Sequence, residues 1–165
     1  MPSAVLGLGA AVFGLVLTTA AAAADLKRYS YQGAPFTDAM APFAAGQSIT
    51  GHFIIDCAVA GGASGCRKLP RGDYRDAVTA FRFTAGGITI DQHSAGLRER
   101  SFVMVTDANG ALRFWQVDLV AAAGLILSDH ISSVEDIVCL SAACERQASN
   151  FETPGLWEVD AVNPP

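Results

Sequence analysis

Hydrophobic and polar positions alternate along most of this chain, in short runs separated by turn residues. In the run 48–59, Phe53 and Ile55 fall on one face of an extended segment, and His52 and Ile54 fall on the other. A period of two is typical of β-strands that are buried on one side. The pattern predicts strands at 29–36, 48–59, 78–84, 88–93, 101–107, 111–120, 125–131 and 156–159.

Turn residues between these runs predict two tight hairpins. Gly86-Gly87 separates the third and fourth runs, and Asn109-Gly110 separates the fifth and sixth. Both dipeptides readily take the positive φ values that short hairpins need. Residues 37–47 and the Gly- and charge-rich segment up to Asp76 are expected to be loops. Segment 132–140 is ambiguous, because Ser132 and Glu135 fit a helical capping box whereas residues 137–140 favour a strand.

About eight consecutive strands joined by short turns predict an all-β domain built as an antiparallel meander. Such a meander buries its apolar face either by closing into a barrel or by folding into a two-sheet sandwich. The pattern slightly favours the barrel. No linker or internal repeat divides residues 25–165, so we expect a single domain there.

Residues 1–24 have the pattern of a secretory signal peptide. An uncharged apolar stretch runs from Ala4 to Leu17, and small residues Ala22 and Ala24 precede the polar start at Asp25. This arrangement predicts cleavage before Asp25. The apolar stretch is shorter than the roughly 20 residues of a spanning helix. We therefore expect a secreted protein, periplasmic or extracellular.

The net charge argues against a nucleic-acid partner, and the hydropathy argues against a membrane span in the mature chain. The chain has 165 residues and a formal net charge of −5, whereas nucleic-acid-binding proteins usually carry a basic excess. The longest apolar run after the signal peptide, 117–127, is interrupted by Asp118 and Gly124. We expect no nucleic-acid partner and no membrane span in the mature chain.

The four cysteines form two close pairs in the sequence, Cys57 with Cys66 and Cys139 with Cys144. An even number of cysteines in an exported chain indicates disulfides, although four cysteines allow three connectivities. The Gly-rich segment 61–65 favours a bridge from Cys57 to Cys66. Metal binding is the alternative, but neither pair has the spacing of a zinc site.

Short aromatic and glycine motifs are spread over most of the mature chain. They are Tyr29-x-Tyr31-x-Gly33-x-x-Phe36, Ile49-Thr50-Gly51-His52-Phe53, Phe81-Arg82-Phe83, Val105-Thr106-Asp107-Ala108-Asn109-Gly110 followed by Trp115, and Pro154-Gly155-Leu156-Trp157. Together they resemble a group of small exported bacterial proteins of unknown function, many of which end in a PEP-CTERM sorting signal. The Pro-Glu-Pro motif of that signal is absent from this sequence. The resemblance implies export and brings no catalytic residues.

The sequence predicts no catalytic, metal-binding or cofactor-binding residues. His52 and Asp56 lie about 13 Å apart along one strand, too far for direct contact. No Gly-x-Ser-x-Gly elbow is present. If the strands closed into a barrel, one face would line its interior, as in small barrels that hold a ligand. On that basis we expect the ligand-lining residues to be Tyr31, His52, Arg82 and Trp115.

Basic residues at 67, 68, 71 and 75 crowd one loop and alternate with Asp73 and Asp76. A solvated loop is the simplest interpretation, and an anion contact is the alternative. Residues 71–73 also spell an Arg-Gly-Asp tripeptide, which arises readily by chance.

These observations favour a non-enzymatic, disulfide-stabilised exported domain that binds a small molecule or a surface polymer. The alternative is a hydrolase or isomerase whose site is assembled only in three dimensions.

Processing gives the first testable prediction. Signal peptidase should cleave after Ala24, because only there do two small residues precede a polar start. The intact mass of the exported protein is therefore expected to correspond to residues 25–165. An exported soluble form that retains Met1 would contradict this prediction.

Overall fold

A computed structural model describes residues 24–62, 65–130, 134–141, 143–151 and 153–161. Within these residues the chain forms twelve β-strands and no helix, which confirms the all-β prediction. Correspondingly, the described part contains no helix of the length and apolarity needed to cross a membrane.

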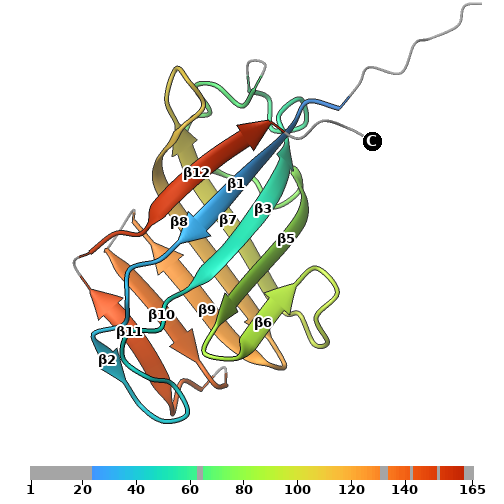
Figure 1. The fold of residues 1–165 in the computed structure, drawn as a ribbon. Helices are drawn as coiled ribbons and strands as arrows, with labels where there is room; N and C mark the ends of the chain where they lie inside the picture. The colour runs from blue at the N-terminus through green and yellow to red at the C-terminus, as the bar shows by residue number, and fades with distance from the viewer. Residues whose placement is uncertain (1–23, 63–64, 131–133, 142, 152, 162–165) are drawn as a thin grey trace, which may run out of the picture.

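The strands form two antiparallel sheets that face each other (Figure 1). The five-stranded sheet has the order β12 (Leu156–Ala161), β1 (Leu26–Gln32), β3 (Thr50–Asp56), β5 (Val78–Ala85) and β6 (Ile88–Asp91). The seven-stranded sheet has the order β2 (Asp38–Ala39), β11 (Gln147–Phe151), β10 (Glu135–Cys139), β9 (Gly124–Asp129), β8 (Leu112–Ala121), β7 (Glu99–Thr106) and β4 (Gly72–Asp73).

The long strands follow the predicted meander. Strands β5 and β6 pair across Gly86-Gly87, and β7 and β8 pair across the turn that contains Gly110. All three glycines have positive φ, at 54°, 86° and 80°, as the two predicted hairpins require. Apart from the short strands β2 and β4, the chain passes to the seven-stranded sheet after β6 and returns to the five-stranded sheet after β11, so that β12 pairs with β1. No closed barrel is found among the described strands, and the preference for a barrel is therefore not confirmed.

Both edges of the seven-stranded sheet are two-residue strands that the sequence pattern did not predict. Strand β2 lies in the expected loop 37–47 and pairs with β11. Strand β4 lies in the charge-rich loop before Asp76 and pairs with β7. An unpaired edge is a template for aggregation, and short edge strands limit that risk. Loops of one sheet therefore protect the edges of the other.

The C-terminal part of this sheet differs from the expectation in a second way. The ambiguous segment 132–140 contains strand β10, while Ser132 of the proposed capping box lies outside the described residues. Strand β11 was missed because its sequence, Gln-Ala-Ser-Asn-Phe, lacks apolar alternation. Ser149 and Asn150 are nevertheless buried, at 0% and 3% exposure.

Aromatic rings occupy the space between the sheets. Phe53 of β3 and Phe81 of β5 each lie 5.4 Å from Phe102 of β7, measured between ring centroids. Tyr31 of β1 lies 4.7 Å from Trp157 of β12 in the same layer. These residues hold the inward positions of the predicted period-two pattern, and their contacts join the two sheets.

Both predicted cysteine pairs form disulfides in the structure, Cys57–Cys66 and Cys139–Cys144. The first pair is fully buried, and the loop that it closes is fixed to β7 because the Thr106 hydroxyl donates a 2.5 Å hydrogen bond to the Cys66 carbonyl. Two disulfides are consistent with an oxidising, non-cytoplasmic location.

Removal of the first disulfide should measurably destabilise the protein. A disulfide that closes a loop of this size lowers the entropy of the unfolded chain and thereby stabilises the folded protein by roughly 2–3 kcal/mol. The variant Cys57→Ala/Cys66→Ala is expected to lose at least that much free energy of unfolding in urea, because it also loses buried sulfur contacts. An unchanged unfolding midpoint, or a peptide map that joins Cys57 to Cys139, would contradict the assignment.

Candidate functional site

The four residues predicted to line a ligand site fall into two groups. Tyr31 and Trp115 are buried between the sheets, at 4% and 7% exposure, with ring centroids 6.0 Å apart. His52 and Arg82 are cross-strand neighbours on β3 and β5, on the solvent side of the five-stranded sheet. The four residues therefore do not line one shared lumen.

The buried group belongs to a polar network that crosses between the sheets. The Tyr31 hydroxyl donates to both carboxylate oxygens of Asp136 on β10, at 2.8 and 2.9 Å. The Trp115 indole N–H donates to the Ser128 hydroxyl on β9 at 3.0 Å. Asp136 and Ser128 are cross-strand partners, and both are buried. The network therefore links β1 of one sheet to β8, β9 and β10 of the other.

Two glycines make room for this network. A side chain at Gly33, directly after β1, would overlap the Asp136 carboxylate. A side chain at Gly155, directly before β12, would overlap the Tyr31 hydroxyl. Nothing in the local sequence around Gly155 indicates that a side chain of another strand approaches it.

Burial raises the pKa of Asp136 to about 6, although hydrogen bonds from Ser128 and Tyr31 act in the opposite direction. Burial, together with the charge of Asp136, also raises the pKa of Tyr31 above its usual range. Carboxyl, hydroxyl and phenol groups converge here as they do in some active sites. Their exposure of only 1–4% keeps substrates away, so the network is structural.

The exposed group lies in a cross-strand row on the outer face of the five-stranded sheet. The row runs across all five strands as Glu158, Ser30, His52, Arg82 and Asp91. Neighbouring strands lie about 4.8 Å apart, so the row is about 19 Å long. It offers hydrogen-bonding and charged groups to a ligand that lies across the strands.

His52 lies at the centre of this row. Its pKa is lowered by partial burial and then by the positive charges of Arg28 on β1 and Arg82 on β5. His52 is consequently neutral at neutral pH. Arg28 lies two residues from Ser30 on the same face of β1, so three basic side chains from adjacent strands share this region.

An open depression adjoins the row at its β12 end. Its volume is about 390 Å³, and it is lined by Ser30, Tyr31, Gln32, Leu156 and Glu158. Leu156 is 74% exposed and gives the depression an apolar border. We define the outer-face site as this depression together with the row of Ser30, His52 and Arg82 and the adjacent Arg28.

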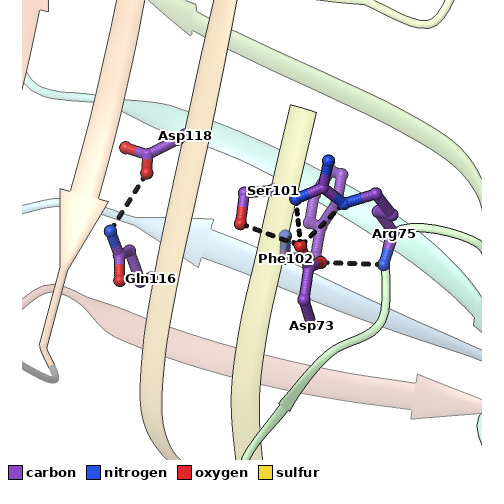
Figure 2. A network of polar contacts seen from close by, with 6 residues as sticks. All are labelled: Asp73, Arg75, Ser101, Phe102, Gln116 and Asp118. Carbon is purple, nitrogen blue, oxygen red and sulfur yellow. Dashed lines mark hydrogen bonds and ion pairs between the residues drawn. The ribbon is translucent and has the colours of Figure 1, made fainter. Parts of the chain in front are cut away.

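The opposite outer face has a different polar network, which holds edge strand β4 in place. The Asp73 carboxylate accepts hydrogen bonds from the Phe102 N–H at 3.1 Å and the Ser101 hydroxyl at 3.3 Å, and it pairs with the Arg75 guanidinium (Figure 2). Burial raises the pKa of Asp73, but the hydrogen bonds from Arg75 and Phe102 outweigh it and hold the pKa below its usual range. The aspartate of the tripeptide at 71–73 is therefore engaged within the protein.

Beside this network, Gln116 donates a 3.0 Å hydrogen bond to Asp118 on β8 (Figure 2). Burial raises the pKa of Asp118, and the negative charges of Glu99, Asp129 and Asp73 raise it further. The part of this outer face around Asp118 is therefore acidic, whereas the centre of the other outer face is basic.

The other two histidines are not part of the outer-face site. His93 is exposed in the turn after β6, and His130 follows β9 and stacks on Trp115 at 4.6 Å between ring centroids. Among the described residues, no group of three or more His, Cys, Asp or Glu is arranged to hold a metal ion.

Comparison with known proteins gives no match to this chain among protein-family models, curated proteins or solved structures. What the outer-face site can bind therefore follows from its own side chains.

The buried network predicts an unusual dependence of stability on pH. The pKa of Asp136 is about 6 in the folded protein against 3.8 for a free side chain, so folding favours the protonated carboxyl. The contribution of Asp136 to stability should therefore fall by about 2–2.5 kcal/mol as pH rises from 4 to 7.

The variant Asp136→Asn stays neutral and still accepts a hydrogen bond from Tyr31, so its free energy of unfolding should lack this fall. Urea unfolding of both proteins between pH 4 and 7 measures the difference. Glu145→Gln, at an exposed carboxyl, serves as the control and should follow the wild-type profile. Parallel pH profiles for wild type and Asp136→Asn would rule out a buried titrating carboxyl.

Proposed function

We propose that this protein is an exported, non-enzymatic binding domain whose ligand surface is the outer face of the five-stranded sheet. The observation that carries the proposal is the open depression of about 390 Å³, which continues into a row of polar and basic side chains. Exposed polar groups on a rigid sheet can bind a ligand without any rearrangement of the fold.

The proposed export rests on residues 1–24 and on the disulfides. Asp25, the first residue after the proposed cleavage site, accepts hydrogen bonds from the Gly65 N–H on its side chain at 2.7 Å and from the Cys57 N–H on its backbone at 2.9 Å. The first disulfide loop thus holds the start of the proposed mature chain. Kinship with the small exported bacterial proteins that the motifs resemble is part of the same proposal.

Of the two ligand classes considered, a surface polymer fits the site better than an enclosed small molecule. The rings of Tyr31, Phe53, Phe102 and Trp157 contact one another where a lumen would lie. The outer-face site, by contrast, is open to solvent and extends across several strands. An open, extended surface suits a chain-like ligand, whereas small molecules are usually bound in enclosed pockets.

A bulky side chain in the depression should block binding. Ser30 points outward from β1, so Ser30→Trp fills the depression without entering the core. We expect the variant to lose roughly tenfold or more in affinity for extracellular polymer from the producing cells, measured by co-sedimentation. Its stability should change by less than about 1 kcal/mol.

Gln116→Trp is the matched control, because Gln116 is a half-buried polar residue that points outward from the other sheet. It should bind as the wild type does. Equal binding by all three proteins would exclude the outer-face site. A small molecule that co-purifies with the protein, identified by untargeted mass spectrometry, would replace the polymer as the ligand.

A further inference from the structure

Three basic side chains on the outer-face site come from three adjacent strands. Arg28 lies on β1, His52 on β3 and Arg82 on β5, and His52 and Arg82 are directly opposite each other in the register. Both arginines are exposed, and His52 is half-buried between them. The cluster faces solvent, so a ligand has free access to it.

The positive charges of this cluster at neutral pH come from Arg28 and Arg82. Within the described residues, no ion pair involves Arg28 or Arg82. The two arginines lie close enough to His52 to disfavour its protonated form. A bound anion would offset the repulsion between these arginines and a protonated His52, and it would accept hydrogen bonds from both guanidinium groups.

Acidic residues border the cluster on both edge strands. Asp160 on β12 lies opposite Arg28, and Asp91 on β6 lies opposite Arg82, while Glu158 lies opposite Ser30. A polyanion with closely spaced charges would also lie against these carboxylates and be repelled. A chain with widely spaced charges could place one anionic group on the cluster and neutral groups over the borders.

We infer that the outer-face site binds an acidic polysaccharide and holds one of its carboxylates between Arg28, His52 and Arg82, an inference that rests on the proposed function. The guanidinium groups donate to the carboxylate, and the hydroxyls of the neighbouring sugars lie over the depression near Ser30 and Gln32. Because a carboxylate beside His52 favours the imidazolium form, binding takes up a proton at this residue. Affinity should accordingly increase as pH falls below neutrality.

Affinity electrophoresis with three polysaccharides tests the inference. Hyaluronan carries a carboxylate on alternate sugars, dextran carries no charge, and dextran sulfate carries closely spaced charges. The wild-type protein is expected to be retarded most by hyaluronan. Arg28→Gln/Arg82→Gln should lose roughly tenfold or more of that affinity. The control Arg98→Gln/Arg146→Gln removes the same charge at exposed arginines elsewhere and should bind normally.

Two further variants separate an anion site from a merely structural cluster. Asp160→Asn removes the negative charge opposite Arg28 and should strengthen hyaluronan binding. His52→Gln should abolish the gain in affinity between pH 7.5 and 5.5. A cluster that only stabilises the sheet would leave both measurements unchanged, which would overturn the inference.

The remaining outcomes distinguish this inference from the proposed function. Equal retardation by dextran and hyaluronan, both lost in Ser30→Trp, would overturn the anionic ligand but keep binding at the outer face. Strongest retardation by dextran sulfate would overturn the requirement for widely spaced charges. Retardation by none of the three polysaccharides would overturn the inference, while co-sedimentation with the cells' own polymer would still decide the proposed function.

Discussion

The contact between Tyr31 and Asp136 is the constraint on which the arrangement of the two sheets depends. No backbone ladder joins β6 to β7 or β11 to β12, so between the long strands of the two sheets the contacts are made by side chains, while β2 and β4 add backbone pairing only at the edges. Strand β1 provides two such ties, because Tyr31 donates to Asp136 and Tyr29 donates to the Gly110 carbonyl at 2.8 Å. If the Tyr31 donor were lost, the buried Asp136 carboxyl would lack a hydrogen bond at a cost of about 1–3 kcal/mol, so the contact favours the arrangement of the sheets that preserves it.

Because side chains of strand β1 alternate between its two faces, one face contributes to stability and the other to the proposed binding site. Inward residues of β1, Tyr29 and Tyr31, fix the sheets, whereas outward residues Arg28 and Ser30 belong to the outer-face site. A shift of one residue in the β1–β3 register would exchange the two sets. The buried ties therefore also fix which side chains the outer face displays, and the proposed ligand site inherits its geometry from the core.

The sequence predicted the parts of the fold that depend on local pattern. Both glycine hairpins and the alternating faces of β3 and β5 are confirmed, because turn type and strand period depend on residues that are neighbours in the sequence. Strand β11 was missed because its buried Ser149 and Asn150 are polar. The prediction that Tyr31, Trp115, His52 and Arg82 line one interior depends on a closed barrel. Which face of a strand points to solvent is determined by the partner sheet, and that sheet is formed by residues far apart in the sequence.

The acidic residues of β12 serve two physical purposes at once. This strand ends the five-stranded sheet, and its Glu158 and Asp160 point to solvent beside an edge with no ladder partner among the described residues. Two copies paired antiparallel along β12 would bring these carboxylates together, and like charges on opposing strands are destabilising. The carboxylates that oppose edge-to-edge association are the same ones that border Arg28. Glu158 and Asp160 therefore both protect the edge of the sheet and favour a ligand with widely spaced charges at the proposed site.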